Sequence, residues 1–307
     1  MNSLRISIVE YLNTVPLVRG FTHGPLRGRY QLSFTVPSQC AGALRSGEVD
    51  LAIIPAIELQ RIADLLVIPN LSISSKTSVR SLLLASKLPI RQVLRIALDR
   101  SSRSTQALIR ILCAKHWRIA PQFFEAEPNL ATMLQHADAA LLIGDPALRL
   151  ALNAESDTKR GAPGDLTLPG DVVGLSLPVP LHLYDVVEQW RALTGHPAVL
   201  AVWAARAAVL TPEVIRDFQE SLAYGLQHIS EISAEASHAL NLPAEKIRRY
   251  LTENIDYTLD QENVRGLHAY YEMAAELRLI DKLRPLLIAT LETPEFVGRA
   301  SCSTHSD

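Results

Sequence analysis

The stretch from residue 94 to residue 112 constrains the fold more than any other part of this sequence. Large apolar side chains occupy alternate positions in 94–98, which is typical of a β-strand, and apolar side chains recur at helical spacing in 107–112. The polar residues 99–104 between them indicate a turn. A strand that passes through a short polar turn into a helix is the repeating unit of α/β folds, so we expect an α/β protein.

The turn and the start of this helix are rich in hydroxyl groups and arginine. The residues are Ser101, Ser102, Ser104 and Thr105, with Arg100 and Arg103 among them. The N–H groups at a helix start are unpaired and carry partial positive charge, so they can hold a carboxylate or a phosphate. Most such turns only cap their helix, and on the local pattern alone this simpler interpretation is favoured.

Composition is that of an ordinary globular protein. Hydrophobic residues make up 48% of the 307 residues and charged residues 20%, which suffices for one large or two medium domains. The net charge of -2 gives no reason to expect a nucleic acid partner. No apolar run is long enough to cross a membrane and no signal-peptide pattern opens the chain, so we expect a cytoplasmic enzyme or sensor.

Cysteine and histidine give no sign of a metal site. The three cysteines, Cys40, Cys113 and Cys302, have neither metal-binding spacing nor an even count. The nine histidines are scattered without a ligand motif. These patterns favour a reducing compartment and a protein that needs no metal and no other cofactor.

The order of the predicted elements divides the chain into two lobes. Strands are predicted at 4–9, 30–36, 49–54, 65–68, 71–74 and 79–85, with short helices after the first three. Pro89 marks a crossing into a second lobe, in which the Gly- and Pro-rich segment 153–170 is predicted to be an exposed loop. The strand 198–203 returns the chain to the first lobe, and the sequence is helical from Thr211.

We therefore expect one lobe from residues 1–90 and 200–300, a second from 91–199, and a loose tail at 301–307. Alternating strands and helices predict a mostly parallel sheet in the first lobe. Open α/β sheets bind ligands beyond the carboxyl ends of their strands, so the cleft between the lobes is the predicted site. The polar turns predicted to face it are Tyr11 to Thr14, Asp99 to Thr105, and Gly144 to Asp145.

A series of motifs along nearly the whole chain resembles one enzyme family. The motifs are Tyr11–Leu17 (YLNTVPL), Asp50–Glu58 (DLAIIPAIE), Ser78–Leu84 (SVRSLLL), Ala97–Ser104 (ALDRSSRS), Leu141–Leu148 (LLIGDPAL), Trp190–Gly195 (WRALTG), Ala201–Trp203 (AVW), Ile255–Tyr257 (IDY) and Gly266–Tyr271 (GLHAYY). Each motif alone is weak, but the ordered series resembles the chorismate dehydratases, the first enzymes of the futalosine route to menaquinone.

The resemblance implies a two-lobe fold of the type II periplasmic-binding-protein kind, used for catalysis in the cytoplasm. It also implies that the small-molecule substrate is chorismate, which loses water to give 3-[(1-carboxyvinyl)oxy]benzoate. Asn13 and Ser81 are implied as catalytic residues. The implied substrate-binding residues are Tyr11, Thr14, Ser101, Ser102, Ser104, Thr105, Gly144 and Asp145. The chain departs from the family pattern at 74–77, which lacks the usual glycine, and at 198–200, which lacks the usual phenylalanines.

The residues leave the catalytic base open. Asn13 is an amide and cannot remove a proton from carbon, so the candidates are the enolpyruvyl carboxylate of the substrate, Asp145 and Glu58. Asp145 fits a helix cap before Pro146 better than a catalyst, and Glu58 fits a structural partner as well as a ligand contact. Asn13 also fits a turn-forming residue, and Ser81 fits a strand residue that faces solvent.

Two other functions stay open on the sequence alone. One is a solute-binding or sensor protein that binds a small anion on the same scaffold without turnover. The other is the sister, naphthoate-forming enzyme of the same pathway, for which we expect a Cys-Pro-Asn motif where this chain has Tyr11-Leu12-Asn13. The dehydratase is therefore the preferred interpretation. The oligomeric state is left open.

Overall fold

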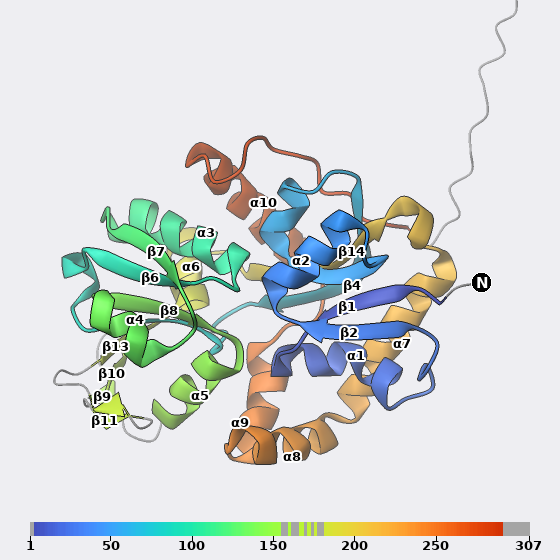
Figure 1. Cartoon of the computed structure of the whole chain (residues 1–307), viewed down its shortest axis with the longest axis horizontal. Coiled ribbons are helices and arrows are strands. Elements are labelled where there is room, and N and C mark those ends of the chain that lie inside the picture. Colours follow the sequence, from blue (N-terminus) through green and yellow to red (C-terminus); the bar gives the residue numbers. More distant parts are fainter. Residues whose placement is uncertain are drawn as a thin grey trace, which may run out of the picture.

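Two sheets with helices on their faces form the two lobes of the molecule (Figure 1). The computed structural model describes residues 3–154, 159–160, 166–168, 171–172, 175–176 and 181–290. The α/β, two-lobe architecture predicted from the sequence is confirmed. Its physical basis is that each helix has to bury one apolar face against a sheet.

The first sheet has five strands in the order β2-β1-β3-β14-β4. They are β1 (Arg5–Val9), β2 (Gln31–Thr35), β3 (Leu51–Pro55), β4 (Leu65–Ser75) and β14 (Ala198–Arg206). β1 lies parallel to β2 and β3, whereas β14 runs antiparallel between β3 and β4. Every residue of β3 is buried, as expected for a strand that is covered on both faces.

The two strands predicted at 65–68 and 71–74 are in fact one strand, β4. Pro69 and Asn70 indicated a break in the sequence, but they cause only a local irregularity. Asn70 adopts a φ of 61°, and the pairing partners along β14 shift between those of Val67 and Ser72. A bulge of this kind bends a strand without ending it.

The second sheet has seven strands in the order β7-β6-β8-β5-β13-β10-β9. They are β5 (Leu82–Ser86), β6 (Arg95–Asp99), β7 (Gln122–Ala126), β8 (Ala139–Ile143), β9 (Lys159–Arg160), β10 (Leu166–Leu168) and β13 (Leu181–Asp185). β11 (Asp171–Val172) and β12 (Leu175–Ser176) pair with each other. β6 lies parallel to β7 and β8, and β5 runs antiparallel to β8 and β13.

The position of β5 corrects the sequence prediction, which put the strand at 79–85 in the first lobe and the crossing at Pro89. β5 pairs with two strands of the second sheet, so the chain crosses before it, between Lys76 and Ser81. The carboxylate of Asp185 accepts hydrogen bonds from the N–H groups of Val79 and Arg80 and anchors this crossing. An apolar strand pattern reports burial and not the identity of the partner strand, which is why the sequence misplaced β5.

The predicted loop at 153–170 and the predicted tail at 301–307 lie largely or wholly outside the described residues. Of the predicted loop, the structure describes three parts: the last two residues of α5 (Gly144–Ala154) and the short strands β9 and β10. Nothing further is described of either segment.

The first sheet is covered by helices from both parts of the chain. The helices nearest to it are α1 (Val15–Thr22), α2 (Pro37–Ser46), α7 (Pro212–Gln227) and α10 (Gln261–Glu276). α8 (Ile229–Leu240) and α9 (Ala244–Arg249) pack on each other, and α8 also packs on α1. α1 packs along α7, and a Cβ atom at Gly225 would lie only 1.9 Å from the carbonyl oxygen of Pro16. Only glycine permits two helices to approach this closely.

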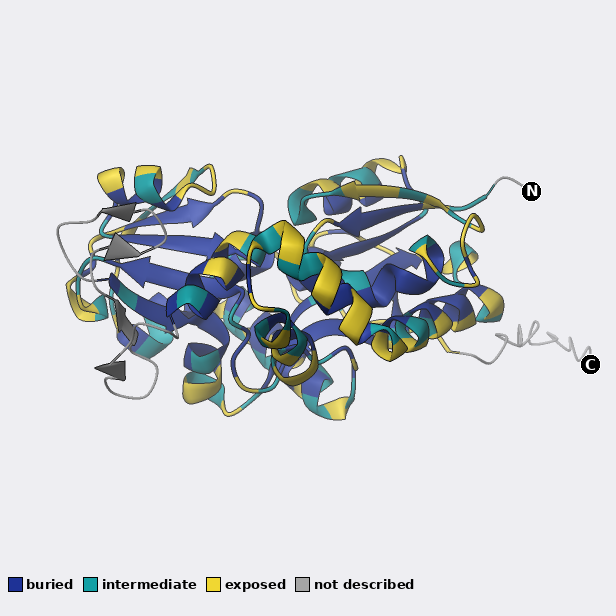
Figure 2. Ribbon diagram, turned by 90° about the horizontal axis from the view of Figure 1, so that it is seen from below, coloured by how far each residue is buried: buried dark blue, intermediate teal, exposed yellow. Residues whose placement is uncertain are grey.

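The second sheet lies between two pairs of helices. α3 (Arg103–Ile111) and α6 (Val186–Thr194) cover one face, and α4 (Leu130–His136) and α5 cover the other. Leu141 and Leu142, neighbours on β8, belong to two separate apolar clusters, and the cluster that contains Leu141 continues into the first lobe. Figure 2 shows the inner strands of both sheets buried beneath helices whose outer faces are exposed, whereas the edge strands β2 and β7 are largely uncovered.

Short helical turns complete the described chain. They are the 3-10 turns η1 (Leu12–Thr14), η2 (Ala56–Gln60), η3 (Ile90–Gln92) and η5 (Ala207–Val209), and the π-helical turns η4 (Leu112–Trp117) and η6 (Tyr250–Asn254). Among the described helices, none combines the length and the apolar character needed to cross a bilayer.

Candidate active site

A cavity of about 60 Å³ lies between the lobes, at the carboxyl ends of strands from both sheets. Val9, Pro55 and Ile143, which end β1, β3 and β8, line it. Seven residues predicted from the sequence also line it: Tyr11, Asn13, Ser81, Ser102, Ser104, Thr105 and Gly144. The other three predicted residues, Thr14, Ser101 and Asp145, do not line it. The location is the one expected for ligand sites of open α/β sheets.

The start of α3 presents hydroxyl groups to this cavity. Ser102 occupies the N-cap position, but its side chain makes no hydrogen bond to the helix, so it does not act as an ordinary cap. Ser104 Oγ accepts a hydrogen bond of 3.1 Å from the N–H of Ile57 and so links α3 to the first lobe. Ser102 and Thr105 line the cavity and have no side-chain hydrogen bond to any described residue, which leaves both hydroxyl groups for a ligand.

Ser101 shapes the turn from beneath and does not face the cavity. Asp99 Oδ1 accepts hydrogen bonds from the N–H of Ser101 at 2.9 Å and from its Oγ at 2.6 Å. Asp99 Oδ2 is buried and has no partner among the described residues, and burial raises the pKa of this carboxyl group. The Asp99 side chain therefore fixes the turn through these hydrogen bonds, although burying its carboxyl group costs desolvation free energy.

Tyr11 spans the cleft and contacts the second lobe at two places. Its hydroxyl group lies 3.5 Å from Ser101 Oγ, and burial raises its pKa to about 12, so the phenol is protonated at neutral pH. Its ring packs on Gly144, where an added Cβ atom would lie 2.6 Å from a ring carbon. Gly144 also has a φ of 66° and donates its N–H to the carbonyl of Ser81. Both the ring contact and the backbone conformation require glycine.

Asn13 and Ser81 meet at a buried tyrosine that the sequence analysis did not identify. Tyr250, in η6, donates a hydrogen bond of 2.9 Å to Ser81 Oγ. Burial raises the pKa of Tyr250 far above its ordinary value, while Ser81 and the Asn13 side chain, within hydrogen-bonding reach, act in the opposite direction. Ser81 is only 1% exposed, so the alternative that it faces solvent is wrong. In the sequence Tyr250 is one more apolar position of a helical pattern, and nothing there marks it.

Asp145 and Glu58, the two carboxylates suggested as bases, do not line the cavity. Asp145 lies in the first turn of α5 but accepts a hydrogen bond from the N–H of Leu12, in the other lobe, instead of capping its own helix. Burial raises the pKa of Asp145. Glu58 is fully buried and contacts the arginines Arg45, Arg61 and Arg103. Both side chains therefore have structural partners.

No metal centre is present among the residues that the structure describes, since no three His, Cys, Asp or Glu side chains cluster there. The chain matches a family model described as menaquinone biosynthesis over residues 4–276. This chain belongs to that menaquinone biosynthesis family. The match covers both lobes and every residue that lines the cavity.

Relatives of this family member agree with the assignment. A curated chorismate dehydratase from Thermus thermophilus is 28% identical over 273 residues, which cover 87% of this chain and 93% of that protein. A solved structure from Archaeoglobus fulgidus has a TM-score of 0.66 at 17% identity and covers 91% of this chain and 98% of that one. The periplasmic aliphatic sulphonate binding protein SsuA from Escherichia coli has a TM-score of 0.60 at 18% identity, with 98% of each chain covered. The predicted periplasmic-binding-protein fold is therefore confirmed.

Proposed function

We propose that this protein is a chorismate dehydratase, which eliminates water from chorismate to give 3-[(1-carboxyvinyl)oxy]benzoate. The observation that carries the proposal is the cavity between the lobes, where seven residues expected from the dehydratase resemblance come together. Membership of the menaquinone biosynthesis family and the 28% identical dehydratase support it. A biosynthetic reaction on a soluble metabolite also supports a location in the cytoplasm.

The reaction needs a site that binds two carboxylates and stabilises a delocalised anion. The proton lost lies on the ring carbon that bears the ether, which is vinylogous to the ring carboxylate. If it leaves first, negative charge spreads into that carboxylate, and loss of hydroxide then makes the ring aromatic. Preorganised hydroxyl and amide donors stabilise such charge. The start of α3, with the free hydroxyls of Ser102 and Thr105 and unpaired N–H groups, suits one carboxylate.

The base is best supplied by the substrate. The polar side chains that line the cavity are hydroxyl groups and one amide, and none is a carboxylate or an imidazole. The high pKa of Tyr11, about 12, also keeps its phenol from accepting a proton at neutral pH. We therefore favour the enolpyruvyl carboxylate of chorismate as the group that removes the proton, over Asp145 and Glu58.

Asn13, Ser81 and Tyr250 are placed to assist the departing hydroxide. Tyr250 donates to Ser81 Oγ, which orients the Ser81 hydroxyl, and Asn13 lies at the same point of the cavity. Donors aimed at charge that develops during reaction act mainly in the transition state. Their contribution is therefore expected in kcat more than in substrate affinity.

The test is incubation of the purified protein with chorismate, followed by chromatography and mass spectrometry of the product. We expect an aromatic acid lighter than chorismate by one water. In the Asn13→Ala variant, kcat should fall by about two to three orders of magnitude with KM changed much less. Binding of chorismate without turnover would instead identify a solute-binding or sensor protein and overturn the proposal.

A further inference from the structure

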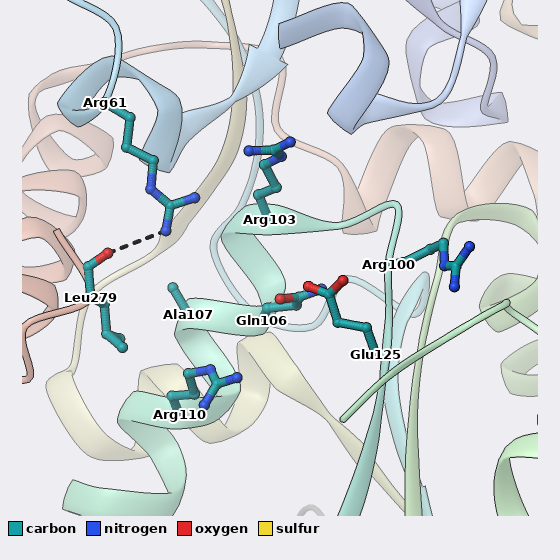
Figure 3. Close-up of a pocket in the computed structure, with 8 residues that line it drawn as sticks. All are labelled: Arg61, Arg100, Arg103, Gln106, Ala107, Arg110, Glu125 and Leu279. Carbon is teal, nitrogen blue, oxygen red and sulfur yellow. Dashed lines mark hydrogen bonds between the residues drawn. The ribbon is translucent and has the colours of Figure 1, made fainter. Parts of the chain in front are cut away.

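A second cavity, of about 310 Å³, lies on the opposite side of α3 from the candidate active site. Four arginines line it: Arg61, Arg100, Arg103 and Arg110 (Figure 3). Arg103, Gln106 and Arg110 share one face of α3, because they are spaced three and four residues apart, whereas Ser102 and Thr105 face the first cavity. The two cavities therefore share a helix wall but no lining residue.

The arginines of the second cavity exceed the carboxylates that could neutralise them. Arg61 donates to Glu58 at 2.9 Å and to the carbonyl of Leu279 at 3.2 Å, the bond drawn in Figure 3. Arg100 pairs with Glu127 at 2.6 Å. These contacts occupy two of the four guanidinium groups.

The other two guanidinium groups have little or no carboxylate contact. Arg103 lies 3.7 Å from Glu58, which Arg45 and Arg61 contact more closely. Arg110 stacks over the ring of Phe123, 4.3 Å from its centre, and forms no ion pair with any described residue.

One acidic side chain lines the cavity as well. Glu125 accepts a hydrogen bond of 3.3 Å from Gln106, which also donates to the carbonyl of Asp99. Figure 3 shows Glu125 beside Gln106, between Arg100 and Arg110. Since Glu58 pairs with Arg61 and Glu127 with Arg100, Glu125 is the lining carboxylate left for Arg103 and Arg110, and the cavity keeps excess positive charge.

The cavity also lies across the junction of the lobes. Arg61 follows η2 of the first lobe and Leu279 follows α10. In the second lobe, Arg103 and Arg110 belong to α3, and Arg100 lies in the turn between β6 and α3. A ligand that contacted Arg61 and Arg110 together would bridge the lobes. Planar guanidinium groups bind phosphate and carboxylate oxygens through paired hydrogen bonds.

We propose that the arginine-lined cavity is a second ligand site, which binds a small anion with two or more negative charges borne by phosphate or carboxylate groups. The site is separate from the cleft, and the proposal does not depend on the dehydratase function, because binding can be measured without turnover.

The test is calorimetric titration of the full-length protein with inorganic pyrophosphate and, separately, with citrate. We expect at least one probe to bind, and its affinity to fall when salt is raised, since these arginines are partly exposed. Arg110→Gln and Arg103→Gln should each weaken binding about tenfold or more, as loss of a hydrogen-bonding charge predicts. Which probe binds better distinguishes a phosphate ligand from a carboxylate ligand.

Two further variants serve as controls, with circular dichroism as the check of folding. Arg95 also stacks on a phenylalanine, 5.5 Å from the ring centre of Phe124, but does not line the cavity, so Arg95→Gln should bind within about twofold of the wild type. Ala201→Leu fills the candidate active site and should also leave binding unchanged. The proposal is overturned if neither probe binds, if Arg110→Gln binds like the wild type, or if Ala201→Leu loses binding.

Discussion

At the scale of single residues, the buried polar groups near the cleft differ in whether they have a partner. Tyr250 donates to Ser81 Oγ, whereas the hydroxyl of Tyr257 and one oxygen of Asp99 are buried with no partner among the described residues. A buried polar group without a partner costs stability, and one that orients a reactive side chain contributes to activity. The contrast gives two predictions.

The first prediction concerns Tyr250 as a positioning residue. Tyr250→Phe removes the donor that orients Ser81, so kcat should fall about tenfold, equivalent to about 1.4 kcal/mol, with a smaller change in KM. Tyr257→Phe removes an equally buried hydroxyl that has no partner, so kcat should be unchanged and the free energy of unfolding should not fall. Steady-state kinetics and urea denaturation of both variants test this. Equal kinetic effects from the two substitutions would show that Tyr250 has no special role.

The second prediction concerns pH and Asp99. Burial raises the pKa of Asp99 in the folded state, so between the unfolded and folded values the folded protein binds more protons. Its stability therefore falls as pH rises through that window. Asp99→Asn removes this dependence and keeps an oxygen for Ser101. As pH rises above the unfolded-state pKa of aspartate, about 3.9, the variant should gain stability relative to the wild type, as urea denaturation would measure.

Asp50 provides a control of opposite sign for this pH effect. The Arg5 side chain, which hydrogen-bonds Asp50, lowers the pKa of that carboxyl group, so its contribution to stability is present above the unfolded pKa and lost on acidification. Asp50→Asn should therefore lose stability relative to the wild type as pH rises. If the stability of both variants relative to the wild type changed in the same direction as pH rises, burial could not be the cause of the shifted pKa of Asp99.

At the scale of elements, the sequence predicted local units well and their partners poorly. The strand, turn and helix expected at 94–112 are β6 and α3, because their periodicities are local properties of the chain. The lobe to which β5 belongs depends on pairing with β8 and β13, which no local pattern encodes. Tyr250 could not be predicted either, because its role depends on a contact with Ser81, which is far away in the sequence. Hydroxyl-rich turns at strand ends were predictable, and their packing against one another was not.

The turn from β8 to α5 gives the third prediction. Gly144→Ala forces a φ of 66° on alanine and places its Cβ against the Tyr11 ring. We expect the free energy of unfolding to fall by about 1–3 kcal/mol and turnover to fall as Tyr11 is displaced. Gly47, which ends α2 with a φ of 78° and has nothing within 4 Å of an added Cβ, is the control. Gly47→Ala should lose about 1 kcal/mol of stability and keep full activity. Full activity in Gly144→Ala would exclude a role for the Tyr11 contact.

At the scale of the whole molecule, the first lobe is assembled from distant parts of the chain. α1 near the beginning and α7 beyond the second lobe pack so closely that Gly225 touches the backbone at Pro16. The apolar core also continues from this lobe into one face of the second sheet. Because the two lobes share this apolar core, the stability of one lobe depends on the other.

The fourth prediction tests this helix contact. Gly225→Ala should lower the free energy of unfolding by about 1–3 kcal/mol, because backbone cannot move aside for a methyl group. Gly42, inside α2, has open space where a Cβ would lie, so Gly42→Ala should raise stability by about 0.5–1 kcal/mol. Thermal or urea denaturation of both variants measures the difference, and similar effects of the two substitutions would contradict the close packing of α1 and α7.

The place of β14 has a consequence for synthesis on the ribosome. β14 fills the gap between β3 and β4, although the whole second lobe separates it from both strands in the sequence. A growing chain therefore carries two unpaired apolar strand edges until β14 emerges, whereas the second sheet is complete once β13 has emerged. Domains usually fold in the order of their synthesis. Hydrogen exchange of ribosome-bound chains that end before Ala198 should show the reverse here, with β6 and β8 protected before β1 and β3. The first lobe therefore completes its sheet after the second lobe, although its first strands are synthesised earlier.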